Sequence, residues 1–281
     1  MESPAILLTL VAGSLCLAFD LPPGPAAYCV PLGRVARLAS SRSKAGDTAL
    51  DVLEKIALGH ADQVTAEEAA NVGFEQSQLK NWVFRDLEVR QCAFRKIGET
   101  GLPAALTFLQ SLTPANVGNN PSNEVWATAQ LALADATLRG IQDPQQQIDF
   151  LEKTATERSG ASGWAVDQLC DRGALGSLSV IEQALRKAYS GEQAQEGIAF
   201  CDARIRVLYG QPDRAKALGS VLNLQTSPDN VRLTHWAMQQ LELMHTPAAD
   251  AELARFQREI DSVPADSPFK QRVVQFSRKA P

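Results

Sequence analysis

The stretch VRQCAFRKIGETGLPAALTFL, Val89–Leu109, contains two helical patterns separated by a short break. From Val89 onward, apolar residues recur at i, i+4 and i+8, which places them on one face of a helix. Gly98 and Gly101 predict the end of this helix, because glycine is a poor helix former and a frequent C-cap. Pro103 suits the first turn of a second helix, where its missing N–H leaves no bond unmade. The stretch therefore predicts a helical hairpin.

The same order of helix, break and helix recurs along the chain at a period of about 36 residues. Further copies contain the stretches WATAQLALADATLRG, GWAVDQLCDRGALG, AFCDARIRVLYGQP and HWAMQQLELMHTP. A fixed period in this range indicates a stacked-repeat protein, since one hairpin cannot bury its apolar face alone. We therefore expect an all-α fold with about five helix pairs between residues 85 and 263.

The first copy, DLEVRQCAFRKIGETGLPAALTFL, resembles a HEAT repeat of the short bacterial kind. The positions that match its pattern are Asp86, Val89, Arg90, Ala93, Ile97 and Gly98. This resemblance implies a right-handed superhelical stack of antiparallel helix pairs, a HEAT-like α-solenoid that binds other proteins. It also implies that Asp86 and Arg90 serve packing between repeats.

The chain opens with an uncharged apolar stretch, Ala5–Ala18, which is shorter than the roughly 20 residues of a membrane span. Its length matches the core of a signal peptide, so residues 1–18 are expected to direct export to the periplasm or secretion. No Lys or Arg precedes the stretch, so a buried helix of a cytoplasmic chain is the alternative, and a retained anchor is the third. After processing, we expect no stable membrane span.

Three further segments flank the repeats. Residues 19–46 contain a proline cluster and a serine cluster, which are typical of an extended linker. A short basic helix over Gly33–Ala39, with Arg34 and Arg37, is the alternative, and the solvated linker is the preferred interpretation. Residues 47–84 are expected to form an N-terminal helical cap, with Asp47 as the N-cap of its first helix. The TAEE sequence from Thr65 has the pattern of a capping box, which predicts a second helix start. Residues 264–281 are expected to be a C-terminal tail.

The composition argues against several functional classes. The net charge of −5 and the pI near 5.3 disfavour nucleic acid as a partner, because phosphate binding requires a clustered positive field. The five cysteines are Cys16, Cys29, Cys92, Cys170 and Cys201. They are odd in number and widely spaced, unlike a disulfide framework, so we expect small buried apolar residues. Whether Cys170 and Cys201 pair is left open.

No catalytic, cofactor-binding or metal-ligating pattern stands out. The three histidines, His60, His235 and His245, lack the spacing and the third ligand of a metal site. No G-x-S-x-G elbow, Walker loop or dinucleotide fingerprint occurs. We therefore predict no cofactor and no metal, and we expect a protein that is not an enzyme.

Two groups of side chains are candidates for partner binding. They are Trp126, Trp164, Trp236, Arg204, Arg206 and Arg214. The tryptophans open the first helices of repeats, where they could anchor a partner in an exposed groove or fill the joint between repeats. The arginines crowd one repeat, where an anionic partner could dock, although a solvated face is the simpler interpretation.

Together these patterns predict a non-catalytic scaffold that binds another protein, of unknown identity, through HEAT-like repeats in the cell envelope. The alternative is an accessory subunit or a lyase-like enzyme with a site in the concave face. That alternative rests on the resemblance of some short HEAT-like proteins to chromophore-lyase subunits. The two hypotheses differ in whether polar residues converge in one pocket.

Overall fold

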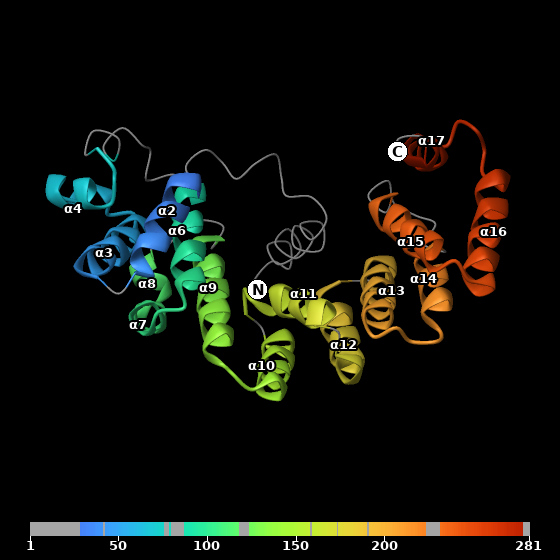
Figure 1. The fold of residues 1–281 in the computed structure, drawn as a ribbon, viewed down its shortest axis with the longest axis horizontal. Coiled ribbons are helices and arrows are strands. Elements are labelled where there is room, and N and C mark those ends of the chain that lie inside the picture. The colour runs from blue at the N-terminus through green and yellow to red at the C-terminus, as the bar shows by residue number, and fades with distance from the viewer. Residues whose placement is uncertain are drawn as a thin grey trace. The chain divides into compact units, whose positions relative to one another are not determined.

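The computed structural model describes residues 29–41, 43–75, 79, 87–117, 124–157, 159–172, 174–189, 191–222 and 231–277. Every regular element in these ranges is a helix, which confirms the expected all-α class (Figure 1). The chain divides into two compact units, unit 1 over Met1–Ala165 and unit 2 over Val166–Pro281, and each is described by itself. The expected signal segment, residues 1–18, and Asp86 lie outside the described residues.

Unit 1 begins with a helix where the sequence predicted a linker. Helix α2 (Cys29–Ala39) packs against α3 (Lys44–Leu58) and α6 (Leu87–Thr100). The residues that α2 buries are Leu32, Val35, Ala36 and Ala39, which share one side of the helix. The linker prediction is wrong for residues 29–39, because Pro31 lies in the first turn of the helix, where proline is tolerated.

Helix α3 starts earlier than the sequence predicted. Its N-cap is Ser43, whose hydroxyl accepts a hydrogen bond from the Gly46 N–H at 3.1 Å. Asp47 is therefore not the cap but lies in the first turn, where its negative charge is favourable toward the helix dipole. Sequence alone did not separate the two, because serine and aspartate are equally good caps.

A capping box starts helix α4 (Ala66–Asn71), as predicted, after a short 3₁₀ turn at Ala61–Gln63. The Thr65 hydroxyl accepts a hydrogen bond from the Glu68 N–H at 3.2 Å, and the Thr65 N–H donates to Glu68 Oε2 at 2.8 Å. The other Glu68 oxygen lies 2.7 Å from Lys55 Nζ of α3. The hydrogen bonds from Lys55 and from Thr65 lower the pKa of Glu68 to about 2.

The stretch that predicted a helical hairpin forms one. Helix α6 ends before Gly101, whose φ of 63° is left-handed, and α7 (Pro103–Ser111) begins at Pro103. Gly98 does not end α6, contrary to the prediction, but is buried within it. A Cβ at Gly98 would lie 2.7 Å from the Ala132 carbonyl oxygen of α9 (Glu124–Gly140). Gly98 therefore allows the backbones of α6 and α9 to approach closely.

Arg90 connects α6 to two other elements of unit 1. Its Nε donates to the Ala57 carbonyl of α3 at 3.0 Å, and its Nη2 donates to the Val117 carbonyl of α8 (Pro114–Val117). Burial lowers the pKa of this guanidinium. Arg90 thus holds α6 to α3 and α8. The packing between repeats that the HEAT resemblance implied for this residue stays a prediction.

Helices continue to the end of the described chain (Figure 1). After α9 they are α10 (Pro144–Thr156), α11 (Ser162–Arg172), α12 (Leu178–Ala188), α13 (Gly191–Leu208), α14 (Arg214–Leu222), α15 (Val231–Met244), α16 (Pro247–Ser262) and α17 (Pro268–Ser277). Helix α17 packs on α15 and contributes Val273 to the core of unit 2. The predicted tail, residues 264–281, therefore contains a packed helix.

Two turns of unit 2 share a backbone conformation although their residues differ. Gly210 follows α13 with a φ of 60°, and His245 follows α15 with a φ of 47°. Among the described residues, His245 is the non-glycine residue with a positive φ. The left-handed region is strained for a residue with a Cβ, so His245 occupies a position where glycine costs less.

Candidate functional site

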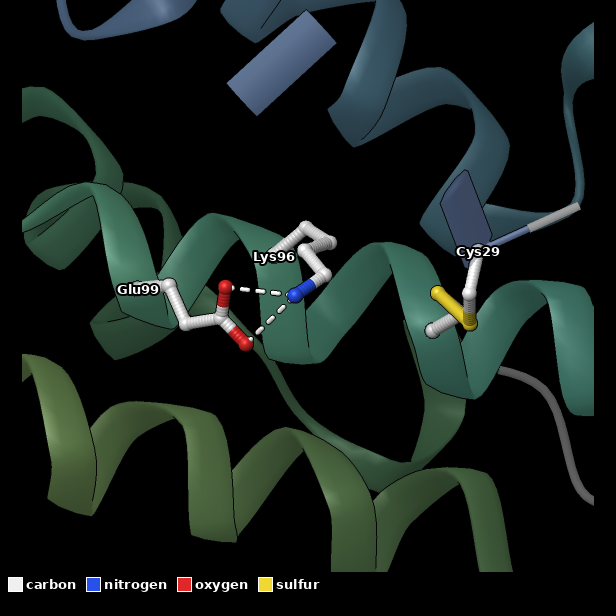
Figure 2. The surroundings of a disulfide bond; sticks show 4 residues. Cys29, Lys96 and Glu99 are labelled. Atoms are coloured by element: carbon white, nitrogen blue, oxygen red, sulfur yellow. Dashed lines mark hydrogen bonds and ion pairs between the residues drawn. A yellow bond between two sulfur atoms is a disulfide. The ribbon is translucent and has the colours of Figure 1, made fainter. Parts of the chain in front are cut away.

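Four cysteines form two disulfides, which corrects the expectation of free buried thiols. Cys29 at the start of α2 is bonded to Cys92 of α6, with 5.8 Å between their Cα atoms (Figure 2). Cys170 of α11 is bonded to Cys201 of α13, with Cα atoms 5.1 Å apart. The pairs are 63 and 31 residues apart in sequence, so only helix packing brings them together. The fifth, Cys16, lies outside the described residues.

An ion pair lies near each disulfide, but the two ion pairs differ in the helices that they join. Beside Cys29, the Lys96 ammonium of α6 pairs with Glu99 on the same helix at 2.6 Å (Figure 2). Beside the other disulfide, an ion pair joins the same two helices: Arg204 Nη2 of α13 lies 2.5 Å from Asp171 Oδ1 of α11. A covalent bond and an ion pair therefore hold α11 to α13 side by side.

Two predicted binding residues, Arg204 and Trp236, meet at a third side chain that the sequence analysis missed. The Arg204 guanidinium lies over the Phe200 ring, 5.7 Å from its centroid. The Trp236 ring of α15 meets the same phenylalanine edge-on, with centroids 5.1 Å apart. Phe200 could have been predicted as a neighbour of Arg204, because it lies one helical turn before Arg204 in the sequence. These contacts lie within unit 2, and binding by Arg204 or Trp236 stays a prediction.

A carboxyl near this cluster has a strongly perturbed pKa. Burial and, to a smaller extent, the carboxylate of Asp171 raise the pKa of Asp167 to about 7, against an opposing effect of Arg204. Asp167 and Asp171 are four residues apart on α11, so they share a helix face. Asp167 was not among the predicted residues, because its burial depends on packing between helices, which residue spacing in the sequence does not reveal.

The other two predicted arginines lie near the turn between α13 and α14. Arg206 is held by two carboxylates, Asp202 Oδ1 at 2.8 Å and Asp213 Oδ2 at 2.6 Å. The hydrogen bond to Asp213 is the first cause of a raised Arg206 pKa. Arg214 is the first residue of α14, and its guanidinium lies beside Gly210 of the turn. Arg206 thus stabilises the turn, and the structure does not test binding by either residue.

The remaining predicted residues, Trp126 and Trp164, belong to unit 1. Trp126 is partly buried and packs against the apolar core of that unit. Trp164 is partly buried in the first turn of α11. The six predicted residues are thus divided between the two units, and partner binding by each of them stays a prediction.

Three large apolar side chains of unit 2 face solvent, and we call them the apolar edge. Leu208 is 57%, Tyr209 54% and Leu243 70% exposed. They lie at the C-terminal ends of α13 and α15, next to Val207 and Met244, which both pack on one apolar cluster. Of the other leucine, isoleucine, valine, methionine and aromatic side chains of unit 2, all those whose burial is described are at least partly buried.

A hollow of about 440 Å³ lies in unit 1 near the start of α3. Its charged lining residues are Lys44 and Asp47, and the turn before α7 contributes Leu102 and Pro103. The lining also contains the hydroxyls of Ser41 and Ser43, which lie 2.9 Å apart. The Ser41 hydroxyl donates to the Leu38 carbonyl, and the Ser43 hydroxyl accepts from the Gly46 N–H at the start of α3, so both have local structural partners.

Among the described residues, no three potential His, Cys, Asp or Glu ligands gather around one point. None of the helices described is both long enough and apolar enough to cross a bilayer.

Comparison with known proteins returned no match: no protein-family model fits the chain, and neither curated proteins nor solved structures resemble it significantly. The side chains of the two units are therefore the basis for any functional proposal.

Proposed function

We propose that this protein is a non-catalytic helical scaffold that binds another protein through the apolar edge of unit 2. The supporting observation is the exposure of Leu208, Tyr209 and Leu243 beside one apolar cluster. Exposed large apolar and aromatic side chains are typical of protein interfaces, and the sequence neighbours of these three, Val207 and Met244, pack on the same apolar cluster. Unit 2 would present them from a rigid frame, because α11 and α13 are joined by a disulfide.

A site-specific photo-crosslinker tests the role of the apolar edge. With the crosslinking residue at Tyr209 or Leu243, we expect one discrete protein adduct in living cells. The matched control carries it at Gln257, an exposed position on α16 of the same unit. Equal adducts at all three positions, or none at the edge, would contradict the proposal.

The helix pairs are proposed to stack as a right-handed, HEAT-like α-solenoid. Packing of α6 on α9 and of α14 on α16 supports this, since each is a contact between equivalent helices of successive pairs. A compact globule of this length has a radius of gyration of about 19 Å. We expect a clearly larger value by small-angle scattering, and a value near 19 Å would argue against a solenoid.

Export to an oxidising compartment is part of the proposal. Disulfides persist in secreted and envelope proteins and are rare in a reducing cytosol. Intact masses of the native protein from membrane, soluble-envelope and cytoplasmic fractions test this directly. We expect an envelope species that lacks residues 1–18 and has the mass deficit of two disulfides. A full-length, reduced chain in the cytosol would refute export.

The enzymatic alternative has one observation in its favour, the perturbed carboxyl of Asp167. A carboxyl with a pKa of about 7 is suited to proton transfer near neutral pH. The variant Asp167→Asn distinguishes the two functions. If the protein is a scaffold, cells that carry this variant keep the unmodified phenotype. If it is an enzyme that uses Asp167, those cells lose the phenotype although the variant still binds its protein partner.

A further inference from the structure

One face of α2 exposes an apolar and two basic side chains to solvent, and we call it the α2 face. Val30, Arg34 and Arg37 lie at i, i+4 and i+7, opposite the buried side of the helix. Val30 is 49% exposed, and both arginines are exposed. Helix α2 contains no acidic residue, and neither arginine forms an ion pair with any described residue.

The basic character of α2 continues into the sequence that follows it. Between Leu21 and Gly46 the basic residues are Arg34, Arg37, Arg42 and Lys44, and no Asp or Glu occurs. The whole chain has a net charge of −5, so this stretch differs in sign from the rest. The apolar stretch Ala5–Ala18 precedes it in the sequence by only a few residues.

The α2 face is held in place by bonds on its inner side. The disulfide from Cys29 to Cys92 fixes the first residue of α2 to α6 (Figure 2). Leu32 and Val35 are almost completely buried against the core of unit 1. The outward arginines therefore stand on an ordered helix, and docking would not require the helix to form first.

We propose that the α2 face docks on an anionic phospholipid surface. Clusters of about four to eight Lys and Arg residues beside an apolar segment are typical of segments that bind acidic lipids. Arg34 and Arg37 would contact the headgroups, and the Val30 side chain would enter the layer between lipid headgroups. This exposed apolar side chain on the same face as the two arginines favours a membrane over an acidic protein as the occupant. This proposal concerns unit 1 and is independent of the apolar edge.

Co-flotation of the full chain with lipid vesicles tests this docking. The two probes are vesicles of phosphatidylcholine with phosphatidylglycerol and vesicles of phosphatidylcholine alone. We expect binding to the first, reduced by added salt, and little binding to the second, because the attraction is electrostatic. Absence of binding to the anionic vesicles would refute the proposal.

A pair of matched charge-reversal variants locates the contact. Arg34→Glu with Arg37→Glu should lower partitioning onto anionic vesicles by at least about tenfold, since each basic residue contributes roughly fivefold. The control, Lys216→Glu with Arg258→Glu, changes the net charge equally at exposed positions of unit 2 and should bind like the unmodified chain. Circular dichroism and an intact-disulfide mass check that both variants fold.

Four results would overturn the proposal. Equal losses in both variants would mean that net charge alone drives binding. Unchanged binding of the α2 variant, or equal binding of all chains to phosphatidylcholine alone, would assign the contact to the apolar stretch. Binding to poly-glutamate that depends on Arg34 and Arg37, without binding to either vesicle, would identify an acidic protein as the occupant.

Discussion

Two helix contacts, α6 with α9 in unit 1 and α14 with α16 in unit 2, each contain a glycine but differ in what the glycine faces. Gly98 faces backbone: a Cβ there would lie 2.7 Å from the Ala132 carbonyl oxygen. Gly219 faces a side chain, because the nearest atoms to its missing Cβ belong to the Glu252 carboxyl group. The same residue type therefore serves a rigid backbone contact in one unit and an adjustable polar contact in the other.

Arg255 shows how the contact in unit 2 is organised. Its Nη2 donates to the Gly219 carbonyl at 2.9 Å, and the guanidinium also pairs with Glu252 at 2.9 Å and Glu259 at 2.6 Å. In unit 2, a network of hydrogen-bonded ion pairs thus fills the contact between α14 and α16. In unit 1, the backbones of α6 and α9 pack directly against each other. Long side chains can move at modest cost, whereas two packed helix backbones cannot.

The largest effects are expected from the disulfides. Replacing Cys29 and Cys92 with alanine, or Cys170 and Cys201, should each cost about 4 kcal/mol of unfolding free energy by loop-closure entropy. The longer loop should cost slightly more, by less than about 1 kcal/mol. Chemical denaturation measures the loss, and hydrogen exchange locates it.

The location of the loss distinguishes the two units. Protection should fall in α2 and α6 for the first variant, and in α11 and α13 for the second. Loss of protection in the unit that keeps its disulfide would show that the two units unfold together, contrary to their separate cores.

Alanine substitution of Gly98 and Gly219 should lower stability by smaller and unequal amounts. Gly98→Ala should destabilise unit 1 by about 1–3 kcal/mol, the range for an overpacked core, because the Ala132 backbone cannot withdraw. Gly219→Ala should cost less, because the Glu252 side chain can rotate away. Thermal unfolding of both variants tests this, and an equal or larger cost at Gly219 would contradict the comparison.

The pH dependence of stability should differ between the units through their carboxyls. The pKa of Asp167 is raised from 3.8 to about 7, so the folded state of unit 2 binds this proton more tightly than the unfolded state. Its contribution to stability is fully present below pH 3.8 and is lost as the pH rises through 7. Asp167→Asn should flatten this part of the curve, as measured by denaturation across that range.

Unit 1 contains two carboxyls that act in opposite directions. Burial, with Asp51 adding to it, raises the pKa of Glu54 to about 7, so this group also stabilises at acidic pH. Glu68, with its pKa lowered to about 2, stabilises above 4.5 and loses that contribution as the pH falls toward 2. Unit 1 should therefore be most stable near pH 4.5, and Glu54→Gln should shift that maximum upward.

The smallest effect is expected at the two equivalent turns of unit 2. His245→Gly should stabilise by up to about 1 kcal/mol, because it relieves the positive φ of a residue with a Cβ. Gly210→Ala should destabilise by a comparable or larger amount for the same reason. Thermal unfolding measures both, and a stabilising alanine at Gly210 would show that the turn can change its conformation.

Local pattern accounts for much of the secondary structure. The hairpin from Val89 and the capping box at Thr65 were predicted, because helix periodicity and capping act over a few residues. A linker was preferred to a helix over Gly33–Ala39, and α2 begins still earlier, at Cys29, because its stability depends on α3, α6 and the bond to Cys92, which are distant in sequence. The role of Gly98 was misassigned because the Ala132 backbone that explains it lies on another helix.

The candidate site was predicted less well than the fold. Arg204 and Trp236 were selected individually, but Phe200, which connects them, was not. Leu208, Tyr209 and Leu243 were also missed, because apolar residues in helices are usually buried, and only packing shows which ones are not. Apart from the four-residue spacing between Asp167 and Asp171, nothing in the sequence indicated that the pKa of Asp167 is perturbed.

The sequence by itself determined that the chain is helical, where the α6–α7 hairpin breaks, and that α4 starts with a capping box, because these depend on neighbours within one or two turns. The tertiary structure decided which cysteines pair, which carboxyls are desolvated and which apolar side chains stay exposed. Each of these depends on distances between segments far apart in the chain, and burial, unlike helix periodicity, is set by the whole packed unit.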